Sequence, residues 1–261
     1  MAITFRNLPK GSTIGSGNYV FRHYGDETPA VVMPDYLCFT AEEAGSTVAM
    51  AVNGTPTKNQ AFEYSTDGIN WSVFKPDTTT ITLINIGNKV YFRGNNTTVS
   101  QSSSVYYNFV MSGKIAASGT IMSLLDKTCQ STTISNAYCY YRMFNSCTSL
   151  TTAPALPATT LANYCYYDMF HGCKSLTTSP ALPATTLKSY CYYNMFYGCT
   201  SLQVYSSSGT GHTKAWKIPT SGSASSYRSQ SQMFYNCPGS YKSTFSVSLN
   251  KTFYTQNTPV R

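Results

Sequence analysis

The sequence predicts a mainly β protein with short helical turns, in which an N-terminal arm and a small antiparallel β-sandwich precede a short solenoid of repeats. The first observation behind this is a motif that recurs every 26 residues, at 138–150, 164–176 and 190–202. Self-similarity at a fixed period of this size is typical of solenoids. The second is a series of short apolar runs before the repeats, separated by turn-forming dipeptides. The third is a charged content of 11%, against about 25% in ordinary globular proteins.

Residues 1–36 carry many glycines and prolines and show little apolar periodicity. Two interpretations fit this composition: an extended arm of the kind that reaches a neighbouring subunit, or a loosely packed edge of the next domain. The start of the chain has no apolar run of the length that a secretory signal needs. No stretch approaches the ~20 apolar residues of a membrane span. We therefore expect neither export by that route nor insertion into a membrane.

Residues 37–115 are predicted to form the antiparallel β-sandwich domain. Asp67-Gly68 is a hairpin signal with alternating apolar residues on both sides, and Gly87-Asn88 marks a second turn. Short strands at this spacing are typical of sandwiches. The expected strands are 37–40, 46–52, 61–66, 69–74, 80–86, 90–93 and 105–111.

The solenoid is expected over 116–240, with an insertion at 203–230 and a C-terminal cap and tail at 241–261. Because the terminal repeat of a solenoid needs a cap, we expect the apolar side chains before the repeats to seal its first coil. These side chains are Ile115, Ile121, Met122, Leu124 and Leu125.

Each repeat is predicted to pair a short helical segment with an extended one. In the second copy Cys165, Met169 and Cys173 are spaced i, i+4, i+8, which places them on one face of a helix. Pro180 and Pro183 then permit only a short strand or a polyproline-like run. A fourth, degenerate copy of the motif follows at 231–237. Stacking of such coils predicts ladders of like residues: Leu150, Leu176 and Leu202; Phe144, Phe170, Phe196 and Phe234; Cys147, Cys173, Cys199 and Cys237.

The repeat resembles that of the BspA-like leucine-rich-repeat proteins, whose signature combines Leu-Pro, a spaced Leu, an aromatic residue, a Cys and a further Leu. The matching residues are Leu182-Pro183, Leu187, Phe196, Cys199 and Leu202. Such repeats occur in surface proteins of Bacteroides-type bacteria and in their crAss-like phages. The resemblance covers about 130–240 and implies a leucine-rich-repeat (β/α) solenoid with an interaction surface. The bacterial proteins are adhesive and begin with a signal sequence; this chain departs from them there, which favours a component of a phage particle.

The net charge of +8 is distributed unevenly. Residues 1–130 hold 9 Lys and Arg against 9 Asp and Glu, whereas 131–261 hold 9 against the single acid Asp168. The repeat half should therefore project a positive field. This serves either solubility or docking on an acidic partner, such as a protein shell or an anionic glycan. Nucleic acid is not expected as a partner, since no basic helix or recognised DNA-binding motif is present.

No constellation for catalysis, for a cofactor or for a metal is recognisable, and we expect a non-enzymatic protein. The histidines His23, His171 and His212 are far apart in sequence, and neither a Gly-x-Ser-x-Gly motif nor a phosphate-binding loop occurs. Cysteines within a repeat are spaced Cys-x7-Cys, which is not the spacing of a zinc pair. Ladder neighbours could come within disulfide range, but we expect buried thiols that pack as small apolar residues.

Two sets of residues are candidates for binding. Each repeat carries a tyrosine pair, of which we expect one ring to point inward and the other outward, so that the outward rings form a stacked row for a sugar or a protein. Packing between coils would explain the same pairs. The insertion is Gly- and Ser-rich and is expected to be a loop, either on the binding face or solvated and without a role. The candidates are Tyr141, Tyr167, Tyr193, Lys214, Trp216, Lys217 and Arg228.

These observations predict a non-enzymatic structural or accessory protein of a bacteriophage virion, assembled in the host cytoplasm. It would be a capsid decoration or a fibre-like part, with other virion proteins as partners in symmetric copies and no cofactor. The alternative is a bacterial cell-surface adhesin that binds a host protein or a cell-surface glycan.

Overall fold

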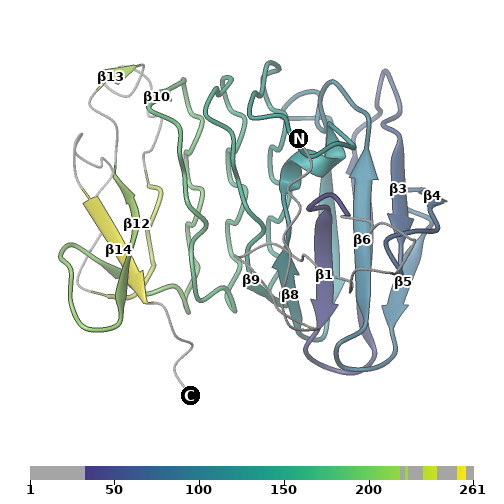
Figure 1. Ribbon diagram of the computed structural model, residues 1–261. Helices are drawn as coiled ribbons and strands as arrows, with labels where there is room; N and C mark the ends of the chain where they lie inside the picture. The colour runs from purple at the N-terminus through teal and green to yellow at the C-terminus, as the bar shows by residue number, and fades with distance from the viewer. Residues whose placement is uncertain (1–32, 218–220, 223–231, 240–251, 257–261) are drawn as a thin grey trace, which may run out of the picture. The chain divides into compact units, whose positions relative to one another are not determined.

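The structure is a computed structural model in which residues 33–217, 221–222, 232–239 and 252–256 are described. Contacts divide the chain into two compact units, Met1–Pro34 and Asp35–Arg261. The arm expected over 1–36 lies outside the described residues up to position 32. The second unit is mainly β, as the sequence predicts (Figure 1).

Two sheets make up the first part of the second unit. One has six strands in the order β4-β3-β6-β1-β8-β9, and the other has three in the order β5-β2-β7. Neighbours pair antiparallel except β8 and β9, which are parallel. The strands are β1 (Leu37–Ala41), β2 (Ser46–Asn53), β3 (Phe62–Ser65), β4 (Ser72–Phe74), β5 (Thr80–Leu83), β6 (Lys89–Gly94), β7 (Tyr106–Ser112), β8 (Ile115–Ser118) and β9 (Leu150–Thr152).

The alternation of apolar and polar residues turns one face of each strand inward. In β6, Val90 and Phe92 are fully buried while Lys89 is exposed. The predicted hairpin joins β3 to β4. Its turn has Gly68 at φ +75, a conformation that glycine adopts without steric cost, and the Asp67 carboxylate accepts the N–H of Ile69 at 2.8 Å.

Phenylalanine side chains hold the two sheets face to face. The ring of Phe109 on β7 lies 4.8 Å from Phe39 on β1 and 5.3 Å from Phe92 on β6, both in edge contacts. All three side chains are at most 1% exposed. Since each buried ring contributes about 1.5–3 kcal/mol, the inner faces of the sheets are the main source of stability in this part of the chain.

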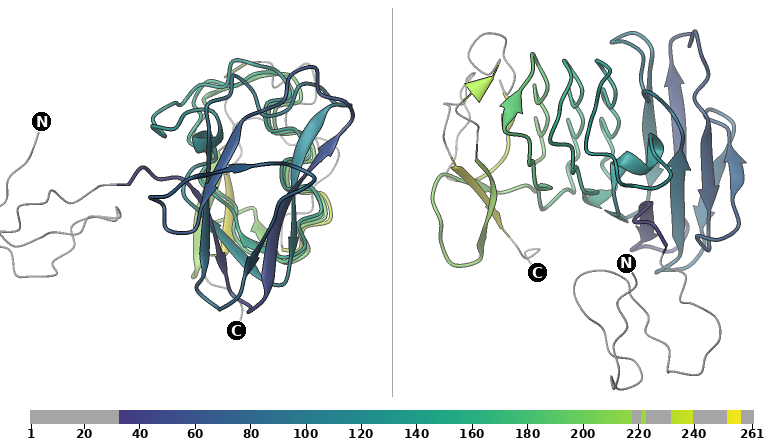
Figure 2. Two further views of the ribbon diagram at one scale, coloured as in Figure 1. Left: turned by 90° about the vertical axis from the view of Figure 1, so that its right-hand side faces the viewer. Right: turned by 45° about the horizontal axis from the view of Figure 1, so that its top comes forward.

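The repeat segments lie one on the next (Figures 1 and 2) and are joined by backbone hydrogen bonds. The N–H of Tyr140 donates to the carbonyl of Cys165 at 2.9 Å, and the N–H of Tyr166 donates in the same way to Cys191 at 3.0 Å. The fourth, degenerate copy continues the same hydrogen-bond register, because the N–H of Phe196 donates to the carbonyl of Met233 at 2.9 Å. Each repeat therefore sets like residues against like.

Within a repeat segment the N–H groups alternate between two kinds of partner. Those of Arg142 and Phe144 donate to the next repeat, whereas that of Asn145 donates back to the Arg142 carbonyl at 2.9 Å. Left-handed backbone recurs at every fourth residue: Tyr138 at φ +60, Arg142 at +56 and Ser146 at +61. Each segment is thus a run of four-residue turns.

The helical segment predicted for each repeat is therefore wrong. No α-helix occurs among the described residues, and their single 3-10 helix, η1 (Ile121–Leu124), lies before the repeats. A four-residue turn brings positions i, i+4 and i+8 to one side much as a helix of 3.6 residues per turn does. The predicted apolar stripe is therefore confirmed, since Cys165, Met169 and Cys173 are all fully buried. The backbone that carries these three residues is not helical.

Strand β7 occupies the place of a repeat that would precede the first one. The N–H of Phe109 donates to the carbonyl of Met143 at 2.8 Å, and the Cys147 thiol donates to the Phe109 carbonyl at 3.1 Å. Between the first two repeats the Phe144 N–H and the Cys173 thiol make the same two bonds, at 2.9 and 3.0 Å. The β-domain therefore caps the repeats with their own hydrogen-bond pattern.

The apolar residues of the junction seal the first repeat, as predicted. The N–H of Ile121 donates to the carbonyl of Ala155 at 3.1 Å, so the junction continues the ladder that β7 begins. Leu125 is half-buried. The other four predicted residues, Ile115, Ile121, Met122 and Leu124, are fully buried.

A spine of phenylalanine rings runs through the repeats. Five rings stack 5.3–5.6 Å apart with interplanar angles of 3–15°, and Phe253 of β14 (Thr252–Gln256) lies 5.1 Å from the last of them. Its first member belongs to β7, so the spine joins the β-domain to the C-terminal strand. The five stacked rings are Phe109, Phe144, Phe170, Phe196 and Phe234.

The insertion at 203–230 is in part a sheet, so the expectation of a loop is wrong there. β11 (Val204–Tyr205) and β12 (His212–Lys217) flank β14 in a three-stranded antiparallel sheet. β10 (Thr186–Leu187) pairs in parallel with β13 (Ser221–Gly222). The partner strand β14 comes from the end of the chain, so no pattern inside the insertion could reveal it. Of the expected cap and tail at 241–261, only β14 is described.

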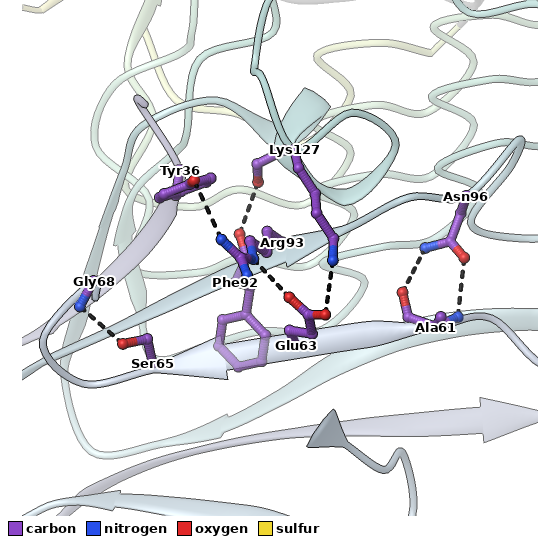
Figure 3. Close-up of polar contacts among 10 residues, drawn as sticks. Tyr36, Ala61, Glu63, Ser65, Gly68, Phe92, Arg93, Asn96 and Lys127 are labelled. Atoms are coloured by element: carbon purple, nitrogen blue, oxygen red, sulfur yellow. Dashed lines mark hydrogen bonds and ion pairs between the residues drawn. The ribbon is translucent and has the colours of Figure 1, made fainter. Parts of the chain in front are cut away.

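A polar clasp ties β3 to the junction before the repeats (Figure 3). The Glu63 carboxylate accepts the Arg93 Nε at 2.6 Å and the Lys127 Nζ at 2.7 Å, while the Arg93 guanidinium lies 3.9 Å from the centroid of the Trp71 ring. Burial disfavours the Glu63 charge, but the two cations outweigh it and hold the pKa of Glu63 below its usual value.

Replacing Glu63 with glutamine should remove about 1 kcal/mol at pH 7, because the carboxylate is partly exposed and solvent screens its ion pairs. A carboxyl whose pKa is lower in the folded chain stabilises the fold above its unfolded pKa and loses that contribution as the pH falls through the folded pKa. Wild type and Glu63→Gln should therefore converge in stability as the pH falls below ~4.3, the ordinary pKa of a glutamate in an unfolded chain. Urea unfolding at several pH values tests this, and a difference that does not change with pH would contradict it.

Candidate functional site: a tyrosine face on the repeats

Six tyrosines, two from each of the first three repeats, form a cluster that we call the tyrosine face. The two rows touch each other, since the ring of Tyr164 lies 6.0 Å from Tyr167 and that of Tyr190 lies 5.5 Å from Tyr193. Five of the six side chains are half-buried. The first row is Tyr138, Tyr164 and Tyr190, and the second is Tyr141, Tyr167 and Tyr193.

The four-residue turn explains why these rings share one side of the repeats. Tyr138 has a left-handed backbone, and its carbonyl accepts the N–H of Tyr141 at 2.9 Å, which closes a turn with both rings on its outer side. Tyr140 lies between them and points inward. It is fully buried, and its hydroxyl donates to the Ile121 carbonyl at 3.1 Å. The Tyr-Cys-Tyr-Tyr motif thus supplies one inner and two outer tyrosines in each repeat.

Stacking within each row covers the ring faces. Tyr164 lies between Tyr138 at 4.6 Å and Tyr190 at 4.8 Å, with interplanar angles of 10° and 6°. Tyr167 lies in the same way between its neighbours in the second row, at 5.2 and 4.8 Å. A half-buried ring with both faces covered can offer only its edge and its hydroxyl group. At its middle repeat the tyrosine face therefore presents hydrogen-bonding groups and ring edges, which carry the positive part of the aromatic quadrupole.

A polar column runs beside the second row, with one residue from each repeat. Arg142 donates from Nε to the Asp168 carboxylate at 2.9 Å, and its guanidinium lies 5.2 Å from the centroid of the Tyr141 ring. The Tyr193 hydroxyl donates to the Gln232 side chain at 3.1 Å. Asp168 is only 4% exposed, so the one acid in 131–261 is buried and paired. The column is Arg142, Asp168, Asn194 and Gln232, and all four have φ between +52 and +56.

Replacing Asp168 with asparagine should lower the free energy of unfolding by about 1 kcal/mol. The loss is small because Arg142 remains accessible to water, with 37% of its side chain exposed, and because asparagine tolerates the left-handed backbone. The reciprocal change Asn194→Asp should cost more, since it sets a second carboxylate next to the buried Asp168. Urea unfolding of both variants tests the order, and the reverse order would contradict this account of the column.

The structure brings three of the candidate residues together and separates the others. Tyr141, Tyr167 and Tyr193 form one row, as expected, but the expectation of an exposed ring is wrong for Tyr141, which is only 6% exposed. The ring of Tyr106 on β7 packs edge-on against it at 5.3 Å and covers it. The β-domain therefore covers the first member of the second tyrosine row and separates it from solvent.

The remaining candidates lie in the insertion. Lys214, Trp216 and Lys217 belong to β12, with a bulge in the pairing to β14 between Lys214 and Trp216, and Arg228 lies outside the described residues. The sequence interpretation missed the row of Tyr138, Tyr164 and Tyr190. Their recurrence every 26 residues could have indicated it. It also missed Arg142 and Tyr106, for which no repeat signal exists.

The ladder cysteines are structural in their chemistry. The Cys173 and Cys199 thiols donate to the carbonyls of Phe144 and Phe170 at 3.0 Å. Burial raises the pKa of Cys147 to about 12 and that of Cys139 to about 11, so these thiols are protonated and unreactive at neutral pH. Across the described residues no group of three or more His, Cys, Asp or Glu side chains could hold a metal ion.

Comparison with known proteins finds no family model, no curated protein and no solved structure that matches this chain. Within the described residues no helix has the length and apolar character needed to span a membrane.

Proposed function

We propose that the chain is a non-enzymatic structural or accessory protein of a bacteriophage virion, either a capsid decoration or a fibre-like part. In this proposal the β-sandwich and a leucine-rich-repeat solenoid form one continuous element that presents the tyrosine face to a partner. The observation that carries the proposal is the ladder of bonds between successive repeats, for example Tyr140 to Cys165 and Tyr166 to Cys191. Solenoids use the exposed side of such a ladder for binding.

The tyrosine face suits recognition because tyrosine combines a large apolar ring with a polar tip and loses little conformational entropy on binding. Stacking already fixes the rings at 4.6–5.2 Å from one another, which lowers that entropy cost further. The virion assignment rests on the resemblance of the repeat motif to BspA-like proteins of phages and on the low charged content.

The mass of the native material tests the assignment. A virion part is expected in symmetric copies on a large shell or tail, by light scattering and by imaging of particles. A lone monomer of 28.7 kDa that adheres to cells would instead support the alternative, a bacterial surface adhesin. That alternative is favoured by the same tyrosine face, since adhesive repeats are what the resemblance implies for the bacterial members.

A further inference from the structure

We propose that the tyrosine face binds an acidic polysaccharide, with the carboxylates of the polymer facing the tyrosine hydroxyls and the Lys188 side chain. The inference rests on the proposed function in one respect, that the repeats present a binding surface. It adds the chemical class of the ligand. It is carried by the charge of the repeats, the covered ring faces and the spacing of the rows.

The charge of this region fits an anion. Asp168 is the single acid of 131–261, and it is buried against Arg142 at 2.9 Å, so its charge is neutralised within the fold. Lys188, in contrast, is exposed. It lies two residues before Tyr190 of the tyrosine face. A ligand on the tyrosine face would therefore meet this cation and the tyrosine hydroxyl groups, with no exposed carboxylate from these repeats to repel it.

The covered ring faces argue against a neutral sugar. A neutral sugar packs its C–H groups on an open aromatic face, but both faces of Tyr164 and Tyr167 are occupied by neighbouring rings. What remains is the positive rim of each ring and an O–H donor. Carboxylate oxygens are the acceptors that such donors bind most strongly.

The spacing argues against an extended acidic peptide. In a β-strand the side chains of one face recur every ~6.6 Å, whereas the rows advance by 4.6–5.2 Å at each repeat. A peptide would lose register with the rows within three repeats. One pyranose residue of an extended polysaccharide spans about the length of one such step, so a uronic acid polymer can place one sugar on each repeat.

The test is calorimetric titration of the full chain with polygalacturonate at low salt, beside the fully methyl-esterified polymer, which has the same backbone and no charge. We expect binding of the acidic polymer alone, weakening as salt is added. The double variant Tyr164→Phe/Tyr167→Phe keeps the ring stacks and removes two hydroxyls, and should weaken binding about tenfold. Lys188→Glu should weaken it further, while Lys89→Glu, the same charge change on an exposed lysine of the β-domain, should leave it unchanged.

Three results would overturn the inference: no binding of polygalacturonate, equal binding of the esterified polymer, or equal binding of poly-glutamate, which would make the partner an acidic protein. An equal loss in the Lys89→Glu control would also overturn it, because the contact would then lie elsewhere. None of these results bears on the native mass of the material, so the virion assignment stands or fails separately.

Discussion

Replacing Phe170 with alanine is expected to lower the free energy of unfolding by about 3–5 kcal/mol. The side chain is fully buried at the middle of the phenylalanine spine, stacked on Phe144 at 5.3 Å and on Phe196 at 5.4 Å. Truncation removes both contacts and leaves a cavity that the neighbouring repeats cannot fill, because hydrogen bonds between repeats fix their separation. Most small domains are stable by only 5–15 kcal/mol, so this change takes a large part of the total.

Urea unfolding followed by circular dichroism gives the measurement, with Val73→Ala as the matched control. Val73 is also a single apolar side chain in the same unit, but it is 70% exposed, and its truncation should change stability by less than about 0.5 kcal/mol. Similar losses for the two variants would mean that the spine does not stabilise the repeats. Phe109→Ala should resemble Phe170→Ala, because Phe109 is the member of the spine that comes from the β-domain.

The spine and the other ladders follow from the sequence because repetition at a fixed period puts equal residues at equal places in successive repeats. The ladder of Leu150, Leu176 and Leu202 needs no further information, and all three are fully buried. The backbone within a repeat could not be predicted in the same way. Over the nine residues from Cys165 to Cys173, a turn of four residues and a helical turn of 3.6 residues bury the same side chains.

The tyrosine face could be predicted only in part for a related reason. Recurrence identifies which tyrosines form rows, since Tyr167 and Tyr193 occupy equal positions. It does not show what covers the first member of a row, because the residue that covers Tyr141 is Tyr106, on a strand outside the repeats. The pairing of Arg142 with Asp168 could not be predicted either. The two residues occupy equivalent positions in successive repeats, but they are different residue types, so no recurrence in the sequence marks them.

Deletion of residues 164–189, one whole period, is expected to leave a folded protein, whereas deletion of 151–163, half a period, should unfold the repeats. The first deletion joins Asn163 to Tyr190 and brings the third repeat onto the first. The Tyr140 N–H, which donates to Cys165 in the intact chain, then meets the equivalent carbonyl of Cys191. In repeat proteins stability is roughly a sum over repeats and their interfaces, so the cost is that of one repeat and one interface.

The half-period deletion removes fewer residues and should do more damage. It joins Leu150 directly to Tyr164 and leaves no extended segment to return the chain to the start of the next turn segment. Phe170 could then no longer lie on Phe144 while the backbone bonds between these repeats form, and buried N–H groups without partners are costly. The whole-period variant also loses Asp168, so Asn194→Asp is added to it to give Arg142 its carboxylate again.

Near-ultraviolet circular dichroism, which reports the packed tyrosines, and urea unfolding distinguish the two deletions. The whole-period variant should keep a cooperative transition with a smaller dependence on urea, because less surface is exposed on unfolding. The half-period variant should lose both the aromatic signal and the transition of the repeats. If both variants folded equally well, the bonds between repeats would not be what orders this part of the chain, and the case for a solenoid would fall with them.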